Sequence, residues 1–108
     1  MPHDYEKQRH DTIWVWNDLN AGKALPGKIE LDIQFVPGEN PEWSAAHIGL
    51  VEAGYRVSVY DDRRTLQATI GPIENTADEI WKHERATTAI ALNHGFRPDG
   101  WGFVLHPG

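Results

Sequence analysis

The stretch from Lys28 to Phe35 alternates strictly between polar and apolar side chains, and no other feature of the sequence restricts the fold as strongly. In a β-strand successive side chains point to opposite faces of the sheet, so every second residue shares a face. The apolar face of this segment consists of Ile29, Leu31, Ile33 and Phe35. The pattern therefore predicts a strand over residues 28–35 with one buried and one solvated face, as in an antiparallel sheet covered on one side.

Two segments before the middle of the chain have the apolar spacing of helices that pack on one side. The first covers residues 4–20, and its inward stripe is predicted to consist of Tyr5, Arg9, Ile13, Trp16 and Leu19. The second follows Asn40 and Pro41, which favour a helix start, and ends at Gly54, where a left-handed C-cap is expected. Its inward face is predicted to hold Trp43, Ala46, His47, Leu50 and Val51.

A third helix is predicted to open with a capping box, in which Thr76 accepts from a backbone amide and Glu79 reaches back to the cap. It ends near Asn93, and its inward stripe includes the charged residue Glu84. Glu84 has two interpretations: a buried general base with a pKa raised by desolvation, or a residue that lies at the helix flank or pairs with a cation. The second is favoured because charged side chains are seldom fully buried.

Three more strands are expected in the second half of the chain. Residues 55–60 and 65–70 alternate like the two arms of a hairpin, and the second arm is predicted to end before Gly71–Pro72. The last strand is expected over residues 101–105, after a turn at residues 97–100.

The element order is one helix followed by strand, helix, strand, strand, helix and strand. This order predicts an α+β, ferredoxin-like fold, with a four-stranded antiparallel sheet of strand order 4-1-3-2 and two helices on one face. The ferredoxin-like core is expected over residues 28–105, and the helix at residues 4–20 is an addition to it. A length of 108 residues fits one domain, so residues 1–108 are expected to form a single domain.

Composition argues against several classes of function. Sixteen Asp and Glu against ten Lys and Arg give a net charge of -6, which disfavours binding to the phosphates of nucleic acids. The chain has no cysteine, and its six histidines are scattered without a familiar catalytic motif, so we expect no metal, no cofactor and no enzymatic activity. The polar N-terminus and the absence of a long apolar run predict a cytoplasmic protein that does not enter membranes.

The polar face of the strand at residues 28–35 carries two carboxylates, Glu30 and Asp32. If this face stays open, they form an acidic platform for a basic partner, whereas the alternative is a face that is merely solvated. The neighbouring strand exposes Gln67 and Thr69 instead of aromatic residues, so stacking of RNA bases has no support there. We therefore expect a protein partner and no direct contact with nucleic acid.

The segment Asp99-Gly100-Trp101-Gly102 is the second candidate for partner binding. Glycine on both sides lets the backbone approach another element closely and leaves the indole accessible, and tryptophan is an effective interface anchor. The alternative is a turn in which Trp101 packs on the sheet or against the first helix.

Two segments, in this order and at this spacing, resemble a known family. They are Glu52-Ala53-Gly54-Tyr55, followed by a valine-bearing strand, and Asp99-Gly100-Trp101-Gly102. Nearly the whole chain is similar to the regulator of ribonuclease activity B family. The resemblance implies a ferredoxin-like α+β fold and a non-catalytic protein that binds ribonuclease E and alters its RNA processing. The sequence ends at Leu105-His106-Pro107-Gly108 without the long acidic tail of that family, so the identity of the partner stays open.

A second hypothesis comes from a different class of protein. Val36-Pro37-Gly38 lies where amino-acid-sensing ACT domains, which are also ferredoxin-like, bind a small ligand beside a glycine turn. This local likeness implies a regulatory domain that binds a small molecule at a dimer interface. The sequence leaves the oligomeric state open, and a ligand-dependent rise in melting temperature would favour this hypothesis over the first.

Overall fold

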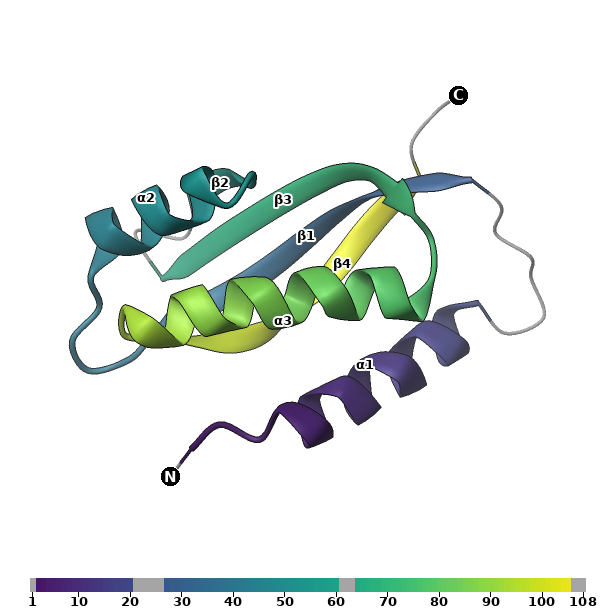
Figure 1. Cartoon of the computed structure of the whole chain (residues 1–108), viewed down its shortest axis with the longest axis horizontal. Helices are drawn as coiled ribbons and strands as arrows, with labels where there is room; N and C mark the ends of the chain where they lie inside the picture. The colour runs from purple at the N-terminus through teal and green to yellow at the C-terminus, as the bar shows by residue number, and fades with distance from the viewer. Residues whose placement is uncertain (1, 21–26, 61–63, 106–108) are drawn as a thin grey trace.

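A β-sheet forms one layer of the structure and helices form the other (Figure 1). The computed structural model describes residues 2–20, 27–60 and 64–105. The strands are β1 Lys28–Pro37, β2 Arg56–Tyr60, β3 Thr65–Glu74 and β4 Phe96–Leu105. They pair in antiparallel fashion in the order β2-β3-β1-β4. This result confirms an α+β fold with the predicted strand order 4-1-3-2, here counted from the opposite edge.

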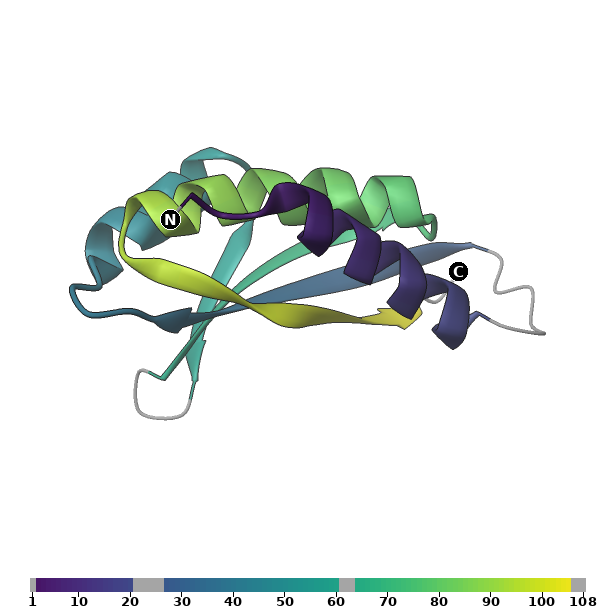
Figure 2. The same cartoon turned by 90° about the horizontal axis from the view of Figure 1, so that it is seen from below.

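The helices of the described residues are α1 Tyr5–Leu19, α2 Trp43–Glu52 and α3 Ala77–Asn93. Seen from below, α2 and α3 lie on one side of the sheet (Figure 2). The helix α3 contacts α1, α2 and the strands β1, β3 and β4, so it is the centre of the helical layer. The helix α1 runs alongside α3 (Figure 1). In the described part of the chain, none of the helices combines the length and the apolar content that a membrane span requires.

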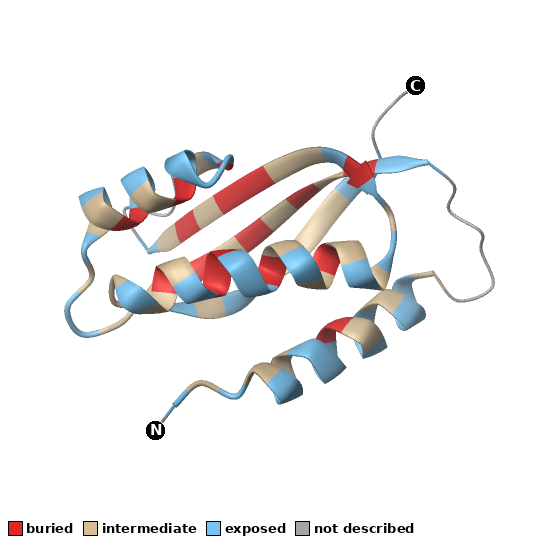
Figure 3. Ribbon diagram, viewed as in Figure 1, coloured by how far each residue is buried: buried red, intermediate tan, exposed pale blue. Residues whose placement is uncertain are grey.

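The apolar face of β1 forms the centre of the core, as predicted. Its four members, Ile29, Leu31, Ile33 and Phe35, are at most 1% exposed. They belong to one cluster with buried side chains from the other strands and from the helices α2 and α3, among them Leu66, Ala68, Phe96, Ala46, Leu50, Ile80 and Ala91. Figure 3 shows buried residues along β1 and β3.

The strand β3 is longer than predicted, because it continues through Gly71–Pro72 to Glu74. The register places Leu31 opposite Ile70 and Ile29 opposite Ile73, so two residues of β3 lie opposite one residue of β1. Such a β-bulge accommodates a proline that regular pairing would reject. A Cβ atom at Gly71 would lie 2.8 Å from the Cα atom of Glu30, so this close approach of two backbones requires glycine.

The strand β4 begins at Phe96, whereas the sequence predicted a turn at residues 97–100 and a strand only from Trp101. A second register shift explains the difference. Phe35 lies opposite Pro98 and Gln34 lies opposite Gly100, so Asp99 is an extra residue in β4. The turn-forming residues thus form a bulge within the strand, with Gly100 at a φ of +116°.

The helix α2 starts at Trp43, two residues after the predicted start at Pro41, and the preceding Glu42 makes no side-chain cap. A backbone hydrogen bond holds the start of the helix instead, because the amide of Glu42 donates to the carbonyl of His94 at 2.8 Å. The predicted ends at Gly54 and Thr76 are confirmed: Gly54 has a φ of +100°, and Thr76 Oγ1 accepts from the amide of Glu79 at 3.1 Å. The second half of the predicted capping box is wrong, because the amide of Thr76 donates to the carbonyl of Glu74 at 3.0 Å and the carboxylate of Glu79 pairs with Lys82.

The change Leu31→Asp should lower the free energy of unfolding by several kcal/mol, because it places an unpaired carboxylate in the apolar core. This is a large part of the roughly 5–15 kcal/mol that stabilises a typical domain. Gln34→Asp is the control, because Gln34 lies on the opposite, partly exposed face of β1. Thermal unfolding followed by circular dichroism measures both variants. A wild-type melting temperature for Leu31→Asp would contradict the assignment of the core.

Candidate functional site

The sheet face opposite the core carries Glu30 and Asp32, and both residues are partly exposed. Glu30 Oε1 forms an ion pair with Nη2 of Arg56 in β2 at 2.7 Å, so an arginine neutralises one of the two predicted carboxylates. Asp32 Oδ1 accepts a hydrogen bond from Thr69 Oγ1 at 2.7 Å. No cation of the described chain forms an ion pair with Asp32. Asp32 is therefore the residue that gives the middle of this face an uncompensated negative charge.

The segment Asp99-Gly100-Trp101-Gly102 lies in β4. Its residues alternate between the helical side of the sheet and the open face. Trp101 opposes Ile33, whose side chain is in the core, so the indole points to the helical side of the sheet. There its Nε1 donates to Thr12 Oγ1 of α1 at 3.2 Å. Trp101 thus packs against the first helix, which was the alternative to an accessible indole. Asp99 is exposed in the bulge.

The register of β4 brings the two predicted binding segments together. Gly102 lies directly opposite Asp32, and Gly100 lies opposite Gln34. Both glycines share the open face with Asp32, so neither covers the sheet on the β4 side of this carboxylate, whereas Thr69 lies opposite it on the β3 side. A Cβ atom at Gly102 would meet no other atom within 4 Å, and its φ lies outside the left-handed region. The fold itself therefore does not require glycine at residue 102.

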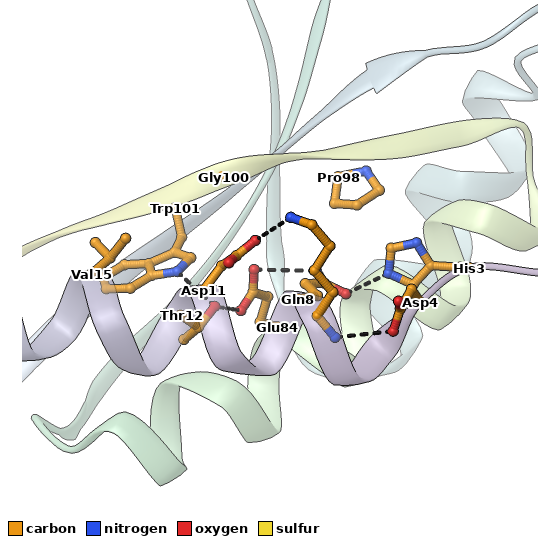
Figure 4. A pocket seen from close by; sticks show the side chains of 11 residues that line it. His3, Asp4, Gln8, Asp11, Thr12, Val15, Glu84, Pro98, Gly100 and Trp101 are labelled. Carbon is orange, nitrogen blue, oxygen red and sulfur yellow. Dashed lines mark hydrogen bonds and ion pairs between the residues drawn. The ribbon is translucent and has the colours of Figure 1, made fainter.

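A cavity of about 500 Å³ lies between α1, α3 and β4 (Figure 4). Its apolar wall includes Val15, Pro98 and Trp101, and its polar wall includes residues of α1 and the carboxyl group of Glu84. Lys7 Nζ and Asp11 Oδ2 form an exposed ion pair at 2.9 Å on the same side. The cavity is thus bounded by charged groups on α1 and by an indole at the sheet.

Glu84 is 4% exposed and accepts hydrogen bonds from two side chains of α1. The hydroxyl of Thr12 donates to Glu84 Oε1, and Gln8 Nε2 donates to Glu84 Oε2 at 3.2 Å. Gln8 Nε2 also donates to Thr88 Oγ1 at 3.0 Å. Burial raises the pKa of Glu84, and the two hydrogen bonds oppose this effect. The favoured interpretation, a residue at the helix flank or paired with a cation, is wrong, because α1 covers Glu84 and donates to it from neutral side chains.

The predicted inward stripe of α1 is wrong in part. Arg9 and Leu19 are exposed, whereas Thr12 is the buried residue of this helix. The helix turns its polar residues at 8 and 12 toward Glu84 and Thr88 of α3. Both pairs have the i, i+4 spacing that places residues on one helix face. Matching polar pairs on two helices were the signal in the sequence that could have identified this contact.

A second set of titratable groups joins α3 to the start of β2. Tyr55 Oη and His83 Nδ1 lie 2.8 Å apart, and His83 Nε2 lies 3.4 Å from Glu79 Oε1. Burial lowers the pKa of His83, and Tyr55 is buried in the core. These groups do not line the cavity. Across residues 2–20, 27–60 and 64–105, His, Asp and Glu side chains form no group of three that could hold a metal ion.

The turn at Val36-Pro37-Gly38, which the small-ligand hypothesis singled out, is engaged by the chain itself. The amide of Gly38 donates to the carbonyl of Gly95 at 2.8 Å. A Cβ atom at Gly38 would lie 3.0 Å from the same oxygen. A ligand at this turn would have to displace that contact, and the cavity beneath α1 lies elsewhere.

Comparison with known proteins assigns no family. No family model matches the chain, and no curated protein matches it. The likeness to the regulator of ribonuclease activity B family therefore rests on the two segments quoted above and remains a hypothesis.

The titration of Glu84 should be visible in the stability of the protein. Because burial raises its pKa, the folded state binds this proton more tightly than the unfolded chain. The stabilisation that protonated Glu84 contributes is complete below pH 4.5, the ordinary pKa of this carboxyl group. It is lost as the pH rises through the raised pKa of the folded state. Glu84→Gln does not titrate, so its free energy of unfolding relative to wild type should increase as the pH rises through this window. Urea unfolding at a series of pH values measures the difference, and a difference that does not vary with pH would contradict the prediction.

Proposed function

We propose that this chain is a non-catalytic, cytoplasmic regulatory protein that binds another protein through the sheet face opposite its core. The observation that carries the proposal is the glycine at residue 102, which lies opposite Asp32 at a place where an added Cβ atom would meet no other atom within 4 Å. Glycine within a strand is destabilising by roughly 0.5–1 kcal/mol relative to alanine. A glycine that packing does not require is typical of a place where another backbone or a ligand approaches closely.

The charge of this surface favours a basic partner. Among the described residues no cation pairs with Asp32, and the chain as a whole has a net charge of -6. Long-range attraction would speed the encounter with a basic segment and orient it over Asp32. Glu30 contributes less to this attraction than the sequence suggested, because its charge is balanced by Arg56.

The resemblance to the regulator of ribonuclease activity B family suggests ribonuclease E as the partner. The ferredoxin-like arrangement, with two helices over the sheet and an additional helix at the N-terminus, agrees with what that resemblance implies. The Asp99-Gly100-Trp101-Gly102 segment has a consistent double role in this proposal. Trp101 holds β4 to α1, and the two glycines keep the opposite face of β4 open to the partner.

The change Gly102→Val should abolish partner binding without harming the fold, because valine favours strands and its Cβ atom would meet no other atom within 4 Å. The measurement is cleavage of an RNA substrate by ribonuclease E at saturating concentrations of the chain. We expect wild type to reduce cleavage and Gly102→Val not to do so. The control is Ala86→Val, which adds a similar side chain to the exposed side of α3. No effect of wild type would reject ribonuclease E as the partner, and full inhibition by Gly102→Val would reject this surface.

The change Asp32→Asn should slow association with a basic partner and weaken its dependence on salt. The amide keeps the shape of the carboxylate and an oxygen for Thr69, so only the charge is removed. Screening shortens the reach of this charge from about 10 Å at 0.1 M salt to about 3 Å at 1 M. Surface plasmon resonance at several salt concentrations measures the association rate. Glu39→Gln, an exposed change outside the sheet, is the control, and an equal effect of both changes would point to net charge rather than to this surface.

A further inference from the structure

The two edges of the sheet differ in how they are protected against pairing with another strand. The edge strand β4 carries Pro98 and the bulge at Asp99, and both features oppose regular pairing at an edge. The other edge strand, β2, pairs with β3 in unbroken register and contains neither proline nor glycine. Its single charged residue, Arg56, is already paired with Glu30. The β2 edge is therefore regular and open on the side away from β3.

The helix beside this edge presents apolar side chains to solvent. Gly49 of α2 lies against α3, because a Cβ atom there would be 3.1 Å from Ile90 Cγ2. At 100° per residue, His47 and Val51 lie on the opposite flank of α2, away from α3. The sequence predicted both on the inward face, but both are exposed. Three exposed apolar side chains gather at α2 and β2, with exposed fractions of 56% for Ile48, 50% for Val51 and 44% for Val59.

A groove of about 440 Å³ lies between α2 and β2 in the same region. Its walls are formed by Trp43, Ser44, His47, Ile48 and Val59. None of these residues is acidic, although the whole chain has a net charge of -6. Two copies that meet at this groove would therefore avoid the repulsion between their acidic surfaces.

We propose that a second copy of the chain covers this edge by antiparallel pairing of the two β2 strands around a two-fold axis at Ser58. The sequence of β2 is self-complementary in this register. Val57 lies opposite Val59 of the second copy on the helical side, and Arg56 lies opposite Tyr60 of the second copy on the open face. The first contact is apolar, and the second places a guanidinium beside an aromatic ring.

The same two-fold axis extends both layers of the structure. The two sheets continue into one another, and the exposed flanks of the two α2 helices meet above the joined strands. An isologous interface of this kind closes on itself, so it produces a dimer and not a larger assembly. The strands β2 and β4 lie at opposite edges, so Asp32 and Gly102 stay accessible in each copy. The dimer would thus offer two partner-binding surfaces, although its formation does not depend on the proposed function.

Engineered cysteines test the register directly, because the chain has no cysteine of its own. At the two-fold axis Ser58 faces itself, and directly opposed residues have Cα atoms about 4.5–5.5 Å apart, within the range of a disulfide. We expect Ser58→Cys to form a covalent dimer under mild oxidation. Tyr60→Cys is the matched control, since Tyr60 faces Arg56 of the second copy. Equal cross-linking of both variants, or cross-linking of Tyr60→Cys alone, would overturn the proposed register.

The mass in solution, measured by sedimentation over a range of concentrations, tests the interface itself. Wild type should be a dimer, whereas Val59→Lys and Ile48→Lys should be folded monomers, because each places a charge in the apolar groove. Trp14→Lys changes an exposed apolar residue of α1 and should remain a dimer. A wild type that is monomeric at every concentration would overturn the proposal. It would indicate that an extended segment of another protein, and not a second copy, binds this edge. A dimer that survives both groove changes would also overturn it.

Discussion

The buried face of β1 is the constraint on which the rest of the structure depends. β1 pairs with β3 on one side and with β4 on the other, so its side chains lie in the middle of the sheet. Burial of each large apolar side chain contributes about 1.5–3 kcal/mol. Because side chains alternate along the strand, the packing of Leu31 and Ile33 under the helices forces Asp32 onto the open face. One strand therefore determines both the core and the candidate binding surface.

A polar network fixes the position of α1 together with the packing of Trp16 against the core. Glu84 accepts from Thr12 and Gln8, and Thr12 in turn accepts from the indole of Trp101. In a medium of low dielectric, such a network is stabilising when every member has a partner and costly when one is missing. The network also reaches the sheet, because Trp101 is a residue of β4. Gly102 is the next residue of the same strand. The helix and the candidate surface thus share the strand β4.

Features that depend on local pattern could be predicted from the sequence, and features that depend on long-range contacts could not. The strand at residues 28–35 and the caps at Gly54 and Thr76 follow from short patterns. The burial of Glu84 depends on Thr12, seventy-two positions away, and becomes visible only when the polar pair of α1 is matched with that of α3. The candidate surface lies between these cases. Asp32 and Gly102 were both predicted as binding residues, but the bulge at Asp99 decides that Gly102, rather than Trp101, lies opposite Asp32. Bulges depend on how two strands fit together, so their positions are seldom visible in one strand alone.

The central claim is that the open face around Asp32 and Gly102 binds a protein partner. The most direct measurement is an NMR titration of the isotope-labelled chain with purified ribonuclease E, in which each backbone amide reports on its own surroundings. We predict that the signals of Asp32 and Gly102 shift or broaden first, while those of the exposed side of α3 stay unchanged. Changes confined to the residues around the cavity beneath α1, such as Lys7 and Val15, would contradict the claim, whereas the absence of any change would reject ribonuclease E as the partner.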